Sequence, residues 1–202
     1  MSELRAETRP AIGLRERKKA KTRAAIQHEA LRLFRLQGYE ATTIEQIVDA
    51  AEVSPSTFFR YFPSKEALVL TDDYDPLIIE TIRSQPSELE PIQAVRRGLS
   101  TVFRALNKEE LAEMRNRADL ALSVPELRAA TLDQFAQTIR QISGVVAERV
   151  GRARDDFAVE TLAGAILGVM IAAEFHWVEH PEIDLIALID DALGQLEAGL
   201  RL

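Results

Sequence analysis

The chain contains no cysteine among its 202 residues, which excludes disulfide bonds, thiolate metal sites and cysteine nucleophiles. Residues 1–25 are polar and basic and lack the apolar segment of a secretory signal peptide. Glycine-rich phosphate loops and the G-x-S-x-G pattern are also missing. We therefore expect a cytoplasmic protein without a cofactor.

Long apolar runs are scarce as well. The longest covers residues 162–173, which is too short to span a bilayer and predicts a buried helix and no membrane partner. No segment alternates between apolar and polar residues as a half-buried strand does, whereas apolar residues recur at helical spacing throughout. The sequence therefore predicts an all-α fold.

Basic residues are fewer than acidic ones, which gives a net charge of −7, but the basic residues are unevenly distributed along the chain. Residues 1–70 carry a net charge of +3, and the remainder carries −10. Residues 15–35 alone hold eight Lys or Arg and two Glu. A phosphate-binding face needs only local positive potential, so this segment is a candidate for nucleic-acid contact. A solvated basic helix would show the same composition.

Aromatic residues are also few, yet the stretch VSPSTFFRYFPSK (residues 53–65) holds four of them within five positions. Phe58 and Phe62 are four residues apart, so we expect them to share one helix face and to pack against Phe34, Ile44, Ile47 and Val48. The hydroxyl and basic side chains of the stretch are left for other faces. At the start of a helix such groups bind phosphates and base edges.

The same region predicts a helix-turn-helix. A helix over residues 14–37 is ended by Gly38, and a second helix opens with Thr43 and Gln46 as a capping box. Ser54 is a suitable N-cap for a short third helix with Pro55 in its first turn.

The rest of the chain predicts further helices, about nine or ten in all. Ser123 and Glu126 match a capping box, and the first of these helices is expected to bend or split around Asp75-Pro76. The expected ranges are 65–84, 91–106, 108–122, 125–151, 156–178 and 183–200. We expect three parts: a flexible tail over 1–13, a three-helix DNA-binding domain over 14–68, and a larger effector-binding and dimerisation domain over 69–202.

The segment GYEATTIEQIVDAAEVSPSTFFRYFPSKEAL resembles the DNA-binding domain of the TetR family of bacterial transcriptional regulators over about residues 18–68. The resemblance implies a homodimeric repressor that binds an inverted-repeat operator and is released by a small molecule. In that family the third helix reads the major groove, and the lysine after F-P-S contacts phosphate. Phe59 departs from the pattern, since the family usually has a phosphate-binding tyrosine there. Without the hydroxyl, we expect this contact to be either apolar packing on a sugar or lost. The residues expected to face DNA are Thr42, Thr43, Ser54, Pro55, Ser56, Thr57, Phe59, Arg60, Tyr61 and Lys65.

The resemblance also implies a dimer interface, and two patterns support it. Gly164, Gly168 and Ala172 recur every four residues, which permits close approach of another helix. The last helix carries an apolar stripe, although such a stripe also suits burial within its own domain. The residues expected at the interface are Gly164, Gly168, Ala172, Ile186, Ile189, Leu193 and Leu196.

An apolar or amphipathic effector, also implied by the resemblance, would bind between the later helices. The candidate lining residues, any of which also suits ordinary core, are Phe103, Met114, Arg117, Phe135, Met170, Glu174 and Trp177. The string RNRADLALSVPELRAATLDQF (residues 115–135) more weakly resembles actinobacterial members with acyl-CoA-like ligands. In that case Arg115 or Arg117 would meet a phosphate or carboxylate.

Two other functions fit parts of the sequence. HWVEH contains H-x-x-E-H, the inverted zinc-protease signature, so a metal-dependent hydrolase using His176, Glu179 and His180 is one alternative. Pro181 follows at once, which places the motif at a helix end and argues against a metal site there. The other alternative is a protein-interaction module that keeps the helix-turn-helix without binding DNA. We expect a regulator rather than an enzyme.

Overall fold

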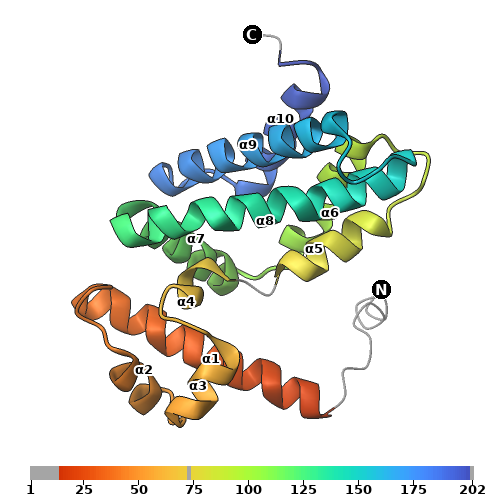
Figure 1. Ribbon diagram of the computed structural model, residues 1–202. Coiled ribbons are helices and arrows are strands. Elements are labelled where there is room, and N and C mark those ends of the chain that lie inside the picture. The colour runs from red at the N-terminus through yellow and green to blue at the C-terminus, as the bar shows by residue number, and fades with distance from the viewer. Residues whose placement is uncertain (1–13, 72–73, 201–202) are drawn as a thin grey trace, which may run out of the picture. The chain divides into compact units, whose positions relative to one another are not determined.

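The computed structural model describes residues 14–71 and 74–200, and these residues form helices and connecting loops without strands. They divide into two compact units, one ending at Leu68 and one beginning at Val69. The helices are α1 (Leu14–Gln37), α2 (Ile44–Ala50), α3 (Pro55–Tyr61), α4 (Ala67–Leu70), α5 (Tyr74–Arg83), α6 (Pro91–Arg104), α7 (Lys108–Ser123), α8 (Pro125–Val150), α9 (Phe157–Glu179) and α10 (Leu185–Glu197) (Figure 1). The prediction of an all-α fold is confirmed.

Local capping sets the boundaries of the short helices in the first unit. Thr43 and Gln46 form the expected capping box at the start of α2. The Ser54 hydroxyl accepts a hydrogen bond from the Thr57 amide at 3.1 Å, and Pro55 occupies the first turn of α3. Gly38 ends α1 with φ of 87°, a left-handed conformation that glycine adopts without strain. These sequence predictions are confirmed.

Large side chains fill the small core of this unit. Phe58 and Phe62 are fully buried, with ring centroids 6.0 Å apart. Phe34, Ile47 and Val48 are buried as well, as the spacing predicted, whereas Ile44 is only half-buried. Burying two phenylalanines stabilises the unit by roughly 1.5–3 kcal/mol each. In a unit of this size, large side chains such as these supply much of the apolar surface that holds α3 in place.

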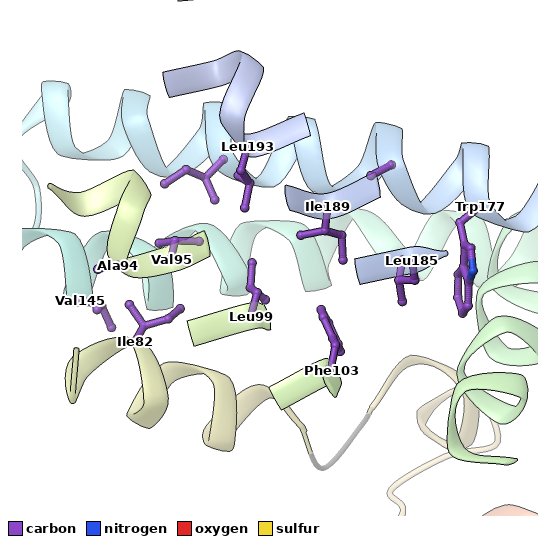
Figure 2. Packing of buried hydrophobic residues seen from close by; sticks show 12 residues of the cluster. Ile82, Ala94, Val95, Leu99, Phe103, Val145, Trp177, Leu185, Ile189 and Leu193 are labelled. Carbon is purple, nitrogen blue, oxygen red and sulfur yellow. The ribbon is translucent and has the colours of Figure 1, made fainter. Parts of the chain in front are cut away.

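The larger apolar cluster of the second unit receives side chains from α5, α6, α8, α9 and α10 that point toward one another (Figure 2), and a smaller cluster joins α8 and α9 at Val146, Ala147 and Val159. In Figure 2 the larger cluster runs from Val145 on α8, Ile82 on α5 and Ala94 on α6 at one end to Trp177 near the end of α9 at the other. Gly98 of α6 lies directly against Ile82 of α5, where an added Cβ would come within 2.5 Å of the Ile82 side chain. A larger residue at position 98 would push these two helices apart.

Two predicted features of the second unit are wrong. The capping box at Ser123 and Glu126 does not form, because α7 continues through Ser123 and Val124 is the residue before α8. The break in the predicted 65–84 helix also lies earlier than expected, since α4 ends at Leu70 and α5 begins at Tyr74. Pro76 falls in the first turn of α5, where no amide hydrogen is needed, so it does not break the helix.

Candidate functional site

The exposed surface of α3 combines hydroxyls, a cation and an apolar ring. Ser54, Pro55 and Ser56 are exposed at its start. The Ser54 hydroxyl oxygen lies 3.0 Å from that of Ser56 and 2.9 Å from that of Thr57. These groups form a connected polar cluster whose remaining hydrogen-bonding capacity faces solvent, as contact with phosphates or base edges requires.

The second half of α3 carries larger groups. Arg60 is exposed, and its guanidinium carbon lies 5.1 Å from the ring centroid of the half-buried Tyr61. Phe59 is 54% exposed and rests edge-on against the buried Phe58 ring, with 5.3 Å between centroids and 87° between planes. The seven predicted DNA-facing residues from Ser54 to Tyr61 therefore include none that is fully buried.

Thr42 was predicted to face DNA, and this prediction is wrong. Its side chain is 1% exposed, and its hydroxyl donates to the Gly38 carbonyl at 2.7 Å. Thr42 therefore holds the link between α1 and α2. Thr43 is exposed, but its hydroxyl accepts the Gln46 amide at 3.3 Å as part of the helix cap.

Lys65 has a structural contact that the sequence did not predict. Its ammonium donates to the carbonyls of Tyr39 at 3.0 Å and Thr42 at 3.2 Å, and lies 4.2 Å from the Tyr39 ring centroid. The buried Tyr39 was missed because nothing in its local pattern distinguished it from a loop residue. Lys65 precedes α4 by two residues rather than opening a helix. An ammonium has three donors, so a third is left for a phosphate.

The basic helix α1 presents Lys18, Lys19 and Lys21 to solvent along its first half. Arg23 instead lies over the buried Phe62 ring, 4.7 Å from its centroid. The side chains of Glu16 and Arg17 and the expected tail over 1–13 lie outside what the structure describes. The described lysines supply positive potential to the same unit as α3, which suits a phosphate backbone.

The second unit contains a cavity of about 290 Å³ with mostly apolar walls. All seven residues predicted to line an effector site border it: Phe103, Met114, Arg117, Phe135, Met170, Glu174 and Trp177. The sequence analysis missed a row of polar side chains on α8, namely Thr131, Gln134, Thr138 and Gln141. Their spacing places them on one side of that helix, but no motif marked them as cavity residues.

The two arginines singled out in the sequence lie in different places. Arg117 borders the cavity, is buried, and donates to the Thr71 carbonyl at 3.4 Å. Arg115 does not line the cavity. It stacks on Trp177 at 4.3 Å from the ring centroid and donates to the Pro181 carbonyl at 2.9 Å. Arg117 is therefore the one of the two that an enclosed anionic group could meet.

One face of α9 is apolar yet uncovered. Nothing lies within 4 Å of a Cβ built on Gly164 or Gly168, and Ala172 is exposed. By length and composition alone, α9 is long and apolar enough to cross a membrane. The sequence analysis had considered only the apolar run of residues 162–173, which is too short to do so. Only 22% of its most apolar 18-residue stretch is buried, because one side of α9, with Ala163 and Ile166, is buried while the side with Gly168 and Ala172 is exposed.

The prediction of a dimer-interface role is wrong for two residues of α10. Ile189 and Leu193 are buried within the core of their own unit, because that side of α10 packs onto α6 and α9 (Figure 2). Ile186 and Leu196 are half-buried and retain accessible surface. The apolar stripe of α10 is thus divided between its own core and the outside.

The H-x-x-E-H motif forms no metal site. The ring centroids of His176 and His180 lie 4.4 Å apart at the end of α9, and His180 Nδ1 lies 3.6 Å from a carboxylate oxygen of Glu182. Within residues 14–71 and 74–200, no group of three or more His, Cys, Asp or Glu side chains is placed to hold a metal ion. The hydrolase alternative has no support in this geometry.

Comparison with known proteins connects the two units to one family. Residues 26–71 match the family described as "Bacterial regulatory proteins, tetR family", and residues 89–201 match the "MftR C-terminal domain". The transcriptional regulator TcmR of Streptomyces glaucescens is 33% identical over 93% of this chain and 88% of its own length. The putative mycofactocin biosynthesis regulator MftR of Mycobacterium tuberculosis is 28% identical over 91% and 93%.

A solved structure shows the same architecture with a ligand. The TetR-family repressor FadR of Thermus thermophilus, in complex with lauroyl-CoA, superposes with a TM-score of 0.52 at 26% identity. The alignment covers 89% of this chain and 95% of that repressor. A regulator with a DNA-binding unit and a ligand-binding helical unit is therefore an architecture that this chain shares with characterised proteins.

Proposed function

This chain belongs to the TetR family of bacterial transcriptional regulators, and on that premise we propose how it works: as a homodimeric repressor released by a small molecule. Two copies would bind an inverted-repeat operator, and an apolar or amphipathic effector would occupy the cavity of the second unit. The observation that carries this proposal is the exposed polar and aromatic face of α3, held on a fully buried aromatic core.

DNA contact follows from the chemistry of that face. The hydroxyls of Ser54, Ser56 and Thr57 lie at the start of α3, the end that enters a major groove in helix-turn-helix proteins. Arg60 and the lysines of α1 add cations for phosphates. An operator made of two half-sites requires two such faces related by two-fold symmetry.

We propose that α9 supplies the centre of the dimer interface. Its uncovered face has phenylalanines near both ends, with Phe157 82% and Phe175 43% exposed. Gly164 and Gly168 lie between them, and the midpoint of both pairs falls at position 166. If two copies cross antiparallel at that point, Phe157 of one copy lies beside Phe175 of the other. Small residues at the crossing then allow the helices to approach closely.

The cavity is proposed to couple ligand and DNA through α4. Val69 and Leu70 border the cavity, and they directly follow Leu68, where the DNA-binding unit ends. A ligand that displaces Val69 and Leu70 would move α4, the helix at the end of the DNA-binding unit. In the ligand-bound dimer the separation of the two α3 helices would then shift toward one that fits the operator poorly. Such a regulator would act in the cytoplasm, where the DNA is.

The DNA-binding part is tested by selection from a randomised DNA pool with the purified full chain at two salt concentrations. We expect enrichment of an inverted repeat with half-site centres about one helical turn, or slightly more, apart. We also expect affinity to fall steeply with salt. Enrichment of nothing at either salt concentration would contradict the proposal. A flat salt response would favour the interaction-module alternative.

The ligand-binding part is tested with the intrinsic fluorescence of Trp177, the one tryptophan of the chain, which lines the cavity. Lauroyl-CoA, the ligand of the Thermus repressor, is a first probe, with lauric acid and coenzyme A as its separated halves. A saturable change with lauroyl-CoA and lauric acid, but not with coenzyme A, would place the acyl chain in the cavity. DNA affinity measured in the same titration should fall as the fluorescence changes.

A further inference from the structure

Phe59 is an exposed apolar ring on a surface whose other features are polar. It is 54% exposed, whereas Phe58 and Phe62 beside it in the sequence are fully buried. The core of the unit is therefore closed without it. Leaving more than half of a phenylalanine side chain in water forgoes a large part of the stabilisation that its burial would provide. This exposure suggests a ring kept for contact with another molecule.

The ring is also held in place. Its edge-on contact with Phe58, at 5.3 Å between centroids and 87° between planes, is the favoured T-shaped arrangement of aromatic pairs. Phe58 is fixed in turn by the core. A phenylalanine has only two side-chain torsions, so a ring supported in this way loses little conformational entropy on binding.

The position of Phe59 places it among the groups proposed to face DNA. It follows Ser56 by three residues and Pro55 by four, so it shares their exposed side of α3. Arg60 comes next and is also exposed. Any duplex that accepts hydrogen bonds from this side of α3 would therefore have the Phe59 ring against it.

Among the base edges in the major groove, thymine alone presents an apolar group, its C5-methyl. A phenylalanine has no hydroxyl with which to bind a phosphate oxygen, so its side chain would form no hydrogen bond with the DNA backbone. We propose that Phe59 packs against the C5-methyl of one thymine in each half-site and so sets a preference for thymine at that position. This inference rests on the proposed function, because it needs a bound operator.

The decisive measurement removes the methyl group alone. In the operator obtained by selection, each thymine is replaced one at a time, in both half-sites together, by deoxyuridine, and the dissociation constant is measured with the full chain. A buried methyl group contributes about fourfold in affinity, so replacement at the contacted position in both half-sites should weaken binding by roughly fifteenfold. If no thymine in an enriched operator shows a penalty, the inference is overturned without any protein variant.

Two variants then assign the methyl contact to the ring. Phe59→Ala should abolish the difference between thymine and uracil at the sensitive position, and Phe59→Tyr should keep it, because the ring remains. Leu36→Ala is the matched control, since Leu36 is 70% exposed in the same unit but lies on α1. Leu36→Ala should leave the full loss of affinity on replacing thymine by uracil. A full penalty in folded Phe59→Ala would overturn the inference, with folding checked by helical circular dichroism.

The outcomes separate this inference from the function on which it depends. Failure to enrich any inverted repeat would contradict the proposed function. An enriched operator that binds equally well with uracil throughout would leave the repressor proposal standing and remove only the role of Phe59.

Discussion

The two units of this protein use their apolar residues differently. In the first unit the large apolar side chains Phe58 and Phe62 are fully buried, and side-chain caps satisfy the starts of α2 and α3. In the second unit an apolar cavity remains open among α5 to α10, and one apolar face of α9 is uncovered. Among the described side chains of the first unit, Leu36 and Phe59 are the exposed large apolar ones, whereas the second unit leaves a cavity and a whole helix face unburied.

This difference matches the partners that each unit is proposed to meet. DNA requires a rigid polar face, and a fully packed core holds such a face in place. A small apolar ligand and a second copy of the chain both require apolar surface that the fold itself does not use. Unburied apolar surface is costly in a free monomer, so the second unit is the part whose stability should depend on partners.

The largest expected effect tests whether packing is tighter in the first unit. Phe58→Ala should destabilise the DNA-binding unit by about 3–5 kcal/mol, because it opens a hole in a closely packed core that also holds Phe34 and Phe62. Urea unfolding of the full chain, followed by circular dichroism, measures this loss. Met170→Ala, in the cavity wall, should cost distinctly less, because one side of Met170 faces open space. Equal losses of unfolding free energy in the two variants would contradict the proposed difference in packing between the two units.

The next effect concerns the uncovered face of α9. Gly168→Glu should convert the proposed dimer into a monomer, since a carboxylate at the helix crossing would be buried without a partner. Sedimentation or light scattering reports the mass, and affinity for a two-half-site operator should fall by about a hundredfold or more. Ala129→Glu, at an exposed position on α8, is the control and should leave both unchanged. A Gly168→Glu variant that stays dimeric would place the interface elsewhere.

Filling the cavity should separate ligand response from DNA binding. Ala121 borders the cavity, and Ala121→Phe should raise the concentration of any effector needed for release by about tenfold or more, because the ring takes up ligand space. Operator affinity without effector should stay the same. Trp177 fluorescence and DNA binding measure the two properties, with Ala136→Phe on the exposed side of α8 as control. Loss of DNA affinity in Ala121→Phe alone would show that the cavity shape also sets the DNA-binding state.

Lys65 tests whether the first unit keeps structural and binding roles apart. Lys65→Ala should weaken binding to all sequences by about three- to tenfold and reduce the salt dependence, because a phosphate contact is lost. Thr57→Ala or Tyr61→Ala should also change which bases are preferred. Because Lys65 also bonds the Tyr39 and Thr42 carbonyls, its variant should melt at a lower temperature. A change in base preference with unchanged affinity in Lys65→Ala would contradict this assignment of roles.

The smallest effect is a pH dependence in the first unit. The pKa of Glu66 lies below its ordinary value of 4.5, mainly because the Ser64 side chain donates a hydrogen bond to the carboxylate. The backbone amide of Glu66 itself makes a second, smaller contribution. A lowered carboxyl pKa adds stability above about pH 4.5, and this is lost as the pH falls through the folded-state pKa. Glu66→Gln should remove less than about 1 kcal/mol at pH 7 and reduce the acid sensitivity of melting. Glu40→Gln, an exposed glutamate in the same unit, is the control. Acid melting curves that coincide for wild type and Glu66→Gln would contradict it.

Much of the first unit was predictable because local chemistry determines it. The cap at Thr43, the N-cap at Ser54 and the burial of Phe58 and Phe62 depend on residues a few positions apart, so their spacing in the sequence was sufficient. Thr42 was the failure. It has the same residue type as its neighbour Thr43, and only the approach of the Gly38 carbonyl decides that its hydroxyl turns inward.

The second unit was less predictable because its contacts join distant parts of the chain. Periodicity alone determined that it is helical and that α9 and α10 carry apolar faces. Tertiary packing decided that Ile189 and Leu193 face their own core, that Arg117 rather than Arg115 borders the cavity, and that α8 lines it with a polar row. A helical stripe specifies which side of a helix is apolar, but which neighbour covers that side depends on helices far along the sequence.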